Sequence, residues 1–209
     1  MISTSLTNLS PNRNRPRNQP ITKITIHHTA GNIGLEALGN MLARTETRAS
    51  YNYGISSDGR IGQFVSEGDR SWASSNAAND HQAITIGVAN ITGAPSWEIS
   101  SAAFESLIEL CVDICRRNNI KELVFDGTPN GNLTLHDMFA NTNCPGPYLR
   151  ARIPDIVYRV NTELSDKPDK WALEAWNWAK EIGITDGSRP KANITRQEMI
   201  TMLHRFSRL

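Results

Sequence analysis

Two histidines and one cysteine stand out because their side chains are the ones that bind transition metals. His27 closes a stretch in which apolar and polar residues alternate, and Cys144 follows eight residues after His136 in a loop flanked by proline and glycine. Imidazole nitrogen and thiolate sulfur suit tetrahedral zinc, and three protein ligands leave the fourth position for water. A zinc-bound water ionises near neutral pH, and the same ion polarises a carbonyl group. Such a set would make hydrolysis of an amide feasible without a serine or cysteine nucleophile.

Spacing alone leaves a second interpretation of this set open. A histidine followed eight residues later by a cysteine is common by chance, so a polar loop histidine beside a buried thiol is the alternative. The other cysteines, Cys111 and Cys115, lie four residues apart on the apolar stripe of a predicted helix, which indicates buried structural thiols. Three cysteines, an odd number in a chain of this size, do not predict a disulfide framework.

Alternating strands and helices are predicted to bring these distant side chains together. Period-two alternation marks the strands, spacings of three and four mark the helices, and Asp-Gly marks a hairpin turn. The predicted elements are strands at 21–28, 83–90 and 123–127, a hairpin within 50–65, and helices at 35–42 and 100–117. This order predicts an α/β (α+β) fold with a mixed central β-sheet flanked by helices. The first strand delivers His27 and His28 to its carboxyl end.

The last part of the chain differs in composition and is predicted to form a separate module. Residues 162–170 are polar and charged, so we expect a catalytic domain at 1–161, a linker at 162–170 and a helical module at 171–209. One helix of the module stops at Gly183, and residues 195–198 form a capping box that opens the next. Two short helices bury little surface, so the module is expected to pack on the first domain, a ligand or another copy of itself.

The overall composition excludes several classes of protein. The chain has 209 residues, of which 39% are hydrophobic and 21% charged, which fits a globular protein and excludes intrinsic disorder. A net charge of +1 argues against a nucleic-acid partner. No apolar stretch reaches the roughly 18 to 20 residues of a membrane helix, and the polar start lacks the apolar core of a secretory signal. We therefore expect neither membrane insertion nor a signal peptide.

Three segments resemble the zinc-dependent N-acetylmuramoyl-L-alanine amidases of type 2. This family includes phage lysins and shares its fold with the peptidoglycan recognition proteins. The segments are ITIHHTA, the stretch from SYNYGISSDGRIGQFV to SWASS, and TLHDMFANTNCPGPYL, in order over roughly residues 20–160. The resemblance implies that His27, His136 and Cys144 bind one catalytic zinc ion. Cys144 favours an enzyme, because relatives that only bind peptidoglycan typically lack this cysteine.

Five further residues are candidates for the site, and the resemblance implies catalytic roles for the first two. The family's catalytic tyrosine corresponds to Tyr51, whose hydroxyl would donate to the carbonyl oxygen or orient the zinc water; an ordinary sheet tyrosine is the alternative. Thr142 takes a catalytic position that holds lysine in some members and threonine in others, and it supplies a hydroxyl without positive charge. Trp72, Asn76 and His28 are candidate substrate-binding residues. Core packing is the alternative for Trp72, and a core or ligand-supporting role is the alternative for His28.

One departure from the family concerns the strand predicted at 83–90. Many relatives carry a glutamate there, which acts as a general base or as a partner of the zinc water. The stretch AITIGVAN contains no acidic residue, so the proton-transfer role has no assigned side chain. The departure favours the alternative function, a non-catalytic protein that binds peptidoglycan, whereas the intact ligand set favours the enzyme.

The tail, WALEAWNWAKEIGITDGSRPKANITRQEMITMLHRF, resembles a single surface-layer-homology motif. In that family the chemistry near the ITR segment binds secondary polymers of Gram-positive cell walls, which implies wall binding through Trp171, Trp176 and Arg196. Such motifs usually occur in threes. A single copy would therefore either assemble with the copies of other chains in a homo-oligomer or bind the polymer weakly by itself. A helical hairpin that only packs on the first domain is the alternative.

These resemblances together predict a phage or prophage lysin. It would cleave the amide bond between N-acetylmuramic acid and L-alanine in the peptidoglycan of Gram-positive cell walls. Without a signal peptide, it is expected to be made in the host cytoplasm and to reach the wall through a separate membrane pore. A muramidase that uses two carboxylates is a third possibility, but no motif marks an acidic pair.

Overall fold

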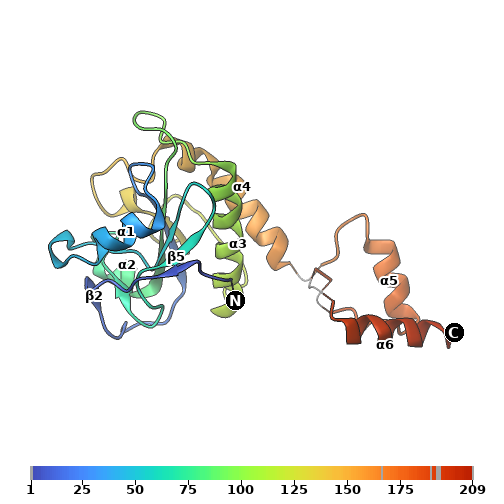
Figure 1. Cartoon of the computed structure of the whole chain (residues 1–209). Coiled ribbons are helices and arrows are strands. Elements are labelled where there is room, and N and C mark those ends of the chain that lie inside the picture. Colours follow the sequence, from blue (N-terminus) through green and yellow to red (C-terminus); the bar gives the residue numbers. More distant parts are fainter. Residues whose placement is uncertain (1, 166, 189, 192–193, 209) are drawn as a thin grey trace. The chain divides into compact units, whose positions relative to one another are not determined.

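The computed structural model in Figure 1 describes residues 2–165, 167–188, 190–191 and 194–208. The chain divides into two compact units, Met1–Asn161 and Thr162–Leu209. Among the helices of the described residues, none combines the length and the apolar character that crossing a membrane requires.

A six-stranded mixed β-sheet forms the centre of the first unit, with the strand order β1-β5-β4-β7-β3-β8. The strands are β1 (Leu6–Thr7), β3 (Lys23–His28), β4 (Tyr53–Ile55), β5 (Ile61–Gln63), β7 (Ala83–Val88) and β8 (Leu133–Leu135). The β4–β5 pair is an antiparallel hairpin, and every other neighbouring pair is parallel. A separate antiparallel pair joins β2 (Arg13–Asn14) to β6 (Arg70–Ser71). This arrangement confirms the predicted mixed sheet and hairpin.

Helices cover both faces of this sheet. They are α1 (Leu35–Leu42), α2 (Ala77–Gln82), α3 (Ser101–Arg117) and α4 (Pro147–Leu164), with short 3-10 turns at Thr45–Thr47 and His136–Met138. A Cβ atom at Gly54 of β4 would lie 2.7 Å from Leu38 of α1. The neighbouring Tyr53 donates a hydrogen bond to Glu67, which in turn accepts one from Arg117 of α3. Successive strand residues point to opposite faces, so α1 and α3 lie on opposite sides, as Figure 1 shows around β5.

The apolar pattern of the sequence explains the core. Leu35, Leu38 and Leu42 of α1 form a buried cluster with Phe64. Helix α3 begins where predicted, because the Ser100 hydroxyl caps it by accepting a hydrogen bond from the N–H of Ala103 at 3.0 Å. The two cysteines of α3, at positions 111 and 115, are completely buried and unbonded, which confirms them as structural thiols.

The prediction of a strand at 123–127 is wrong. The carbonyl oxygen of Val124 accepts hydrogen bonds from the N–H groups of both Asn132 and Leu133, at 3.1 and 3.0 Å, so the segment curls around the following turn. The Val124 side chain is exposed, and its apolar character therefore marks no core position. The place beside β3 belongs instead to β8.

Helix α4 was not predicted, and it crosses into the first three residues of the predicted linker at 162–170. Its buried residues, Leu149, Ile153, Ile156 and Val160, follow the helical spacing of three and four. Pro154 lies inside the helix and obscures this pattern in the sequence, because proline normally interrupts a helix interior.

The N-terminal segment is tied to the first unit, chiefly by Arg17. The guanidinium group donates hydrogen bonds of 2.6 to 3.2 Å to the backbone carbonyls of Glu67, Asp69, His81 and Ala83. The segment also adds β1 and β2 to the two sheets. The basic side chain at position 17 thus serves the fold.

Replacing Arg17 by methionine is expected to lower the free energy of unfolding by about 2 to 3 kcal/mol, because several partly buried carbonyl groups lose a charged donor. Urea unfolding followed by circular dichroism measures the change. The exposed Arg15 provides the control, and Arg15→Met is expected to change stability by less than about 0.5 kcal/mol. Equal stability of the two variants would contradict this role of Arg17.

The described part of the second unit contains the end of α4, α5 (Leu173–Glu181) and α6 (Arg196–Phe206). The predicted capping box is confirmed, since Thr195 Oγ1 accepts from the Glu198 N–H at 3.2 Å and Glu198 Oε2 accepts from the Thr195 N–H at 2.8 Å. Trp178 and Phe206 join the helices, with ring centroids 6.2 Å apart. Among the described residues of this unit, no apolar side chain is buried.

Candidate metal centre

Neighbouring strands place His27 and His136 side by side. In the parallel β3–β8 pair, Ile26 lies opposite Leu135, and the residue that follows each of them is a histidine: His27 in β3, and His136 at the start of the 3-10 turn after β8. The two imidazole centroids are 4.8 Å apart, with His27 completely buried and His136 partly buried. The pairing register therefore brings together two side chains that are more than a hundred residues apart in the sequence.

Cys144 reaches the same place from the loop that follows. Its sulfur accepts a hydrogen bond from the His28 N–H at 3.3 Å and lies 3.7 Å from Nδ1 of His27. The loop closes locally, because Asp137 N–H donates to the Cys144 carbonyl at 3.2 Å and Thr142 Oγ1 accepts from the Cys144 N–H at 3.2 Å. One ligand atom from each of the two histidines and the cysteine lies within 4.8 Å of the others. We call these three residues the metal centre.

The donor atoms of the metal centre fit a zinc ion. Zinc binds sulfur at about 2.3 Å and imidazole nitrogen at about 2.0 Å, so tetrahedral angles separate two such ligands by about 3.5 Å. The observed separation of Cys144 Sγ and His27 Nδ1 is 3.7 Å. The Nε2 atom of His136 is also buried without a hydrogen-bond partner among the described residues. Buried polar atoms without partners are costly, which is typical of a site that holds an ion.

Burial sets the protonation of all three residues. It lowers the pKa of His27 well below its usual value, and repulsion from His136 and His28 adds to this effect. Burial also lowers the pKa of His136, against the opposing charges of Asp80 and Asp137. The imidazoles are therefore neutral near pH 7 and can bind a metal. Burial raises the pKa of the Cys144 thiol to about 12, so the thiol keeps its proton until a cation displaces it.

Tyr51 lies beside the metal centre, and Gly87 makes room for its ring. The tyrosine and His27 ring centroids are 5.2 Å apart. Gly87 pairs with His27 across β3 and β7, and a Cβ atom there would lie 2.8 Å from Cδ2 of Tyr51. Burial raises the pKa of the Tyr51 hydroxyl, with Cys144 adding to the shift. The hydroxyl therefore remains a hydrogen-bond donor rather than a base.

Gly87→Ala is expected to lower kcat by about tenfold to a hundredfold, because the added methyl group displaces the Tyr51 ring from the metal centre. Bound zinc should stay unchanged. The matched control is Gly93→Ala, since a Cβ atom at Gly93 meets nothing within 4 Å. Steady-state kinetics and metal analysis of both variants test this. Full activity in Gly87→Ala would show that the position of Tyr51 does not matter.

The remaining predicted site residues lie in different surroundings. Thr142 is in the ligand loop, where its hydroxyl oxygen accepts from the Cys144 N–H. His28 packs its ring edge-on against Trp97, at 4.9 Å between centroids. Trp72 donates from Nε1 to Asn14 at 2.7 Å. The side-chain oxygen of Asn76 caps α2, and the hydrogen bonds described for Trp72 and Asn76 do not reach the metal centre.

Sequence reasoning missed two carboxylates near the metal centre. Asp80 and Asp137 both act on the pKa of His136. Asp80 is buried and accepts hydrogen bonds from the Ser74 hydroxyl at 2.6 Å and the Ala73 N–H at 3.0 Å, while Asp137 forms an ion pair with Arg150. Asp137 directly follows His136, which was a usable signal. Nothing in the sequence places Asp80 there, because its position depends on how α2 packs. β7 itself is buried throughout and carries no acid.

Solved structures share this fold at low sequence identity. PlyL is 14% identical, with a TM-score of 0.59 over 76% of this chain and 97% of that chain. The Ph2119 endolysin from a Thermus scotoductus bacteriophage is 19% identical, with a TM-score of 0.50 over 68% of this chain and 88% of that chain. The Drosophila peptidoglycan recognition protein PGRP-SA is 20% identical, with a TM-score of 0.54 over 73% of this chain and 92% of that chain. At these identities the likeness concerns the fold alone.

No curated protein matches the chain. The family pattern Amidase_2, described as N-acetylmuramoyl-L-alanine amidase, matches residues 17–147. This range is more than half of the chain, and it contains all three residues of the metal centre. The chain therefore belongs to the N-acetylmuramoyl-L-alanine amidase family.

Proposed function

We propose that this protein is a zinc-dependent hydrolase that cleaves the amide bond between the lactyl group of N-acetylmuramic acid and L-alanine in peptidoglycan. The observation that carries the proposal is the convergence of His27, His136 and Cys144 within 4.8 Å, inside the segment that matches the amidase family. A protein that only recognises peptidoglycan has no use for a complete set of zinc ligands, so the catalytic function is the better supported one.

The side chains divide the chemical work between them. A bound zinc ion would polarise the amide carbonyl and lower the pKa of its water ligand. The neutral imidazoles of His27 and His136 offer lone pairs, and Cys144 contributes a negative charge once its proton has left. Tyr51, which stays protonated, donates a hydrogen bond to the carbonyl oxygen as negative charge develops on it.

Zinc binding at about pH 6.5 is expected to release about one proton per ion, and zinc affinity should rise with pH. The two histidines release none, because burial has already lowered their pKa values. The proton comes from Cys144, whose pKa burial raises to about 12. Calorimetry in two buffers of different ionisation enthalpy counts the protons. Release of none, or of several, would contradict the assigned ligand states.

The cleaved bond is tested on purified Gram-positive peptidoglycan. We expect new amino termini of L-alanine in the soluble products and no new reducing sugar ends. Reducing ends would identify a muramidase instead, and binding without any release would identify a recognition protein. The assay therefore separates the proposed activity from both alternatives.

The protein is further proposed to act as a phage or prophage lysin on Gram-positive cell walls. One structural neighbour is described as a bacteriophage endolysin, and this supports the biological setting. Lysis of Gram-positive cells from outside by the parent protein, and its loss with an inactive variant, would be the expected result. Peptidoglycan is then both the substrate and the principal partner.

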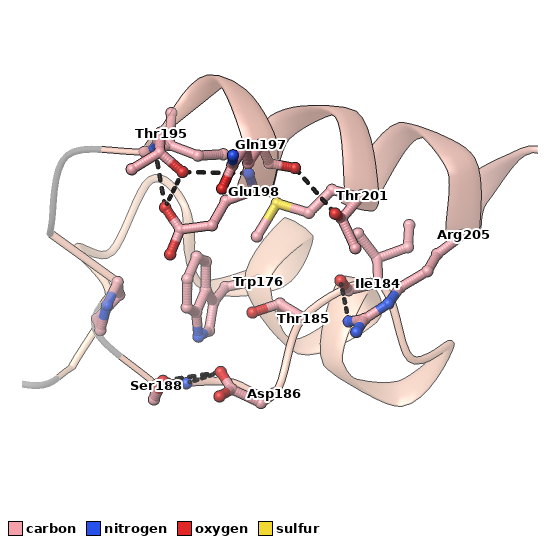
Figure 2. A pocket seen from close by; sticks show the side chains of 13 residues that line it. Trp176, Ile184, Thr185, Asp186, Ser188, Thr195, Gln197, Glu198, Thr201 and Arg205 are labelled. Atoms are coloured by element: carbon pink, nitrogen blue, oxygen red, sulfur yellow. Dashed lines mark hydrogen bonds between the residues drawn. The ribbon is translucent and has the colours of Figure 1, made fainter.

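The second unit is proposed to bind a secondary wall polymer. Figure 2 shows its pocket, which is lined by residues of α5 and α6 and by described residues between them. The volume of this pocket is about 620 Å³. Trp176 and Arg205 both line it, and the Arg205 guanidinium donates to the Ile184 carbonyl at 3.2 Å. Of the predicted wall-binding residues, Trp176 lies in this pocket, whereas Trp171 is 87% exposed, and neither it nor Arg196 lines the pocket. Homo-oligomer formation through this unit stays a prediction.

A binding assay on intact cell walls tests the role of this pocket. The full chain carrying Cys144→Ser is used, so that the walls are not digested. Adding Trp176→Ala should weaken wall binding about tenfold. On walls stripped of secondary polymers, the two proteins should bind equally weakly, through the first unit alone. The comparison variant is Trp171→Ala. Equal loss of wall binding in both variants would show that the pocket is not the binding surface.

A further inference from the structure

Trp97 occupies a loop that closes on itself next to the metal centre. The loop follows β7, and its ends are joined by a 2.7 Å hydrogen bond from the Ile91 N–H to the Glu98 carbonyl. The Asn90 side chain donates to the Trp97 carbonyl at 2.8 Å. Trp97 has a φ of 51°, which a bulky side chain rarely adopts. Such a conformation persists where surrounding contacts hold it, and it directs attention to what the indole touches.

The indole packs against Gly146 and His28, two residues that lie close to the cysteine ligand. A Cβ atom on Gly146 would lie 2.8 Å from Cβ of Trp97 and 3.2 Å from its ring, so the bare backbone of Gly146 packs against the tryptophan. On the other side, the His28 ring meets the indole edge-on at 4.9 Å. Gly146 is two residues beyond Cys144, and the His28 N–H donates to the sulfur of Cys144. Trp97 thus contacts the residues that bracket the thiol.

We propose that Trp97 is a positioning residue that holds the Cys144–Gly146 turn against the end of β3 and so fixes the sulfur ligand. Cys144 is only 5% exposed, although it lies in a loop rather than in the sheet. Two features keep it there: the hydrogen bond from the His28 N–H, and the indole that packs on the following glycine. Without the indole, the turn can open without disturbing the sheet beneath it.

Thiol labelling of the metal-free full chain tests this proposal directly. In Trp97→Ala, the rate at which N-ethylmaleimide modifies Cys144 should rise about tenfold, as expected for local opening. Cys111 and Cys115 are completely buried in α3 and report global loosening in the same sample. Trp97→Phe, which keeps an aromatic ring, should restore most of the protection. Trp171→Ala, which removes an 87% exposed tryptophan from the second unit, is the matched control.

Two labelling results would overturn the proposal. One is an unchanged Cys144 rate in Trp97→Ala, and the other is a rise shared equally by Cys111 and Cys115, which would indicate a general packing role. Mass spectrometry of the separated cysteine peptides distinguishes these results from the expected one.

Zinc affinity gives a second readout, and this part rests on the proposed function. In competition with a chromophoric chelator, Trp97→Ala should bind zinc about tenfold more weakly than the parent, while Trp171→Ala should match the parent. Unchanged zinc affinity would overturn the proposal even if labelling increased. Absence of zinc binding in the parent would refute the proposed function. The role of Trp97 in holding the turn would then be decided by the labelling rates by themselves.

Discussion

Cys144→Ser is expected to remove the zinc ion and to lower kcat/KM by about a thousandfold or more, because a serine hydroxyl does not replace a thiolate ligand of zinc. The lost sulfur lies 3.7 Å from His27 Nδ1, and the change removes the negatively charged ligand of the metal centre. Metal analysis of the purified variant and amide cleavage of soluble muropeptides measure the two losses. His136→Ala should show the same pair of losses.

The fold should survive Cys144→Ser, because Cys144 lies in a loop at the end of the sheet. Cys111, in contrast, lies on the buried face of α3. Cys111→Ala is the control: it should cost about 1 to 2 kcal/mol of stability, through a small cavity, yet keep zinc and activity. A Cys144→Ser protein that retains full activity would rule out the metal centre as the site of catalysis.

Tyr51→Phe is expected to lower kcat by about a hundredfold to a thousandfold while zinc stays bound, because one donor to the developing oxyanion is lost. Burial raises the pKa of this hydroxyl, so activity should not acquire a new alkaline limit from its ionisation. The comparison of kcat with KM is informative: a group that acts only in the transition state changes kcat more than KM.

The control for this substitution lies two residues away. The Tyr53 hydroxyl donates to Glu67 at 2.8 Å, and Glu67 forms an ion pair with Arg117 of α3. Tyr53→Phe should therefore cost about 1 kcal/mol of stability and leave catalysis unchanged. If the two phenylalanine variants were equally active, Tyr51 would be an ordinary sheet tyrosine.

The sequence predicted much of the sheet because local patterns are strong there. Alternation around residues 21–28 located β3 and put His27 at its end, and the Asp-Gly turn located the hairpin. The strand beside β3 was predicted at 123–127, but it is β8. The turn at Val124 and the three-residue β8 are both too short for apolar periodicity to tell a turn from a strand. Motif resemblance, rather than periodicity, identified His136 and Cys144 as partners.

The supporting residues of the metal centre were beyond local patterns. Gly87 matters because the Tyr51 ring fills the space beside it, and that contact joins two strands. Trp97 matters through Gly146, nearly fifty residues later in the chain. Arg17 is tied to carbonyl groups fifty or more residues away. Long-range contacts of this kind leave no periodic trace in one sequence.

Zinc-dependent cleavage of the amide bond is tested most directly by following the cleaved bond and the metal in one experiment. A defined muropeptide is incubated with the parent protein, with protein stripped by a zinc chelator, and with stripped protein given one equivalent of zinc, and the products are identified by mass spectrometry. A free L-alanine amino terminus is expected with the parent, none after stripping, and its return with zinc. Cleavage that persists without zinc, or that occurs at a sugar–sugar bond, would contradict this expectation.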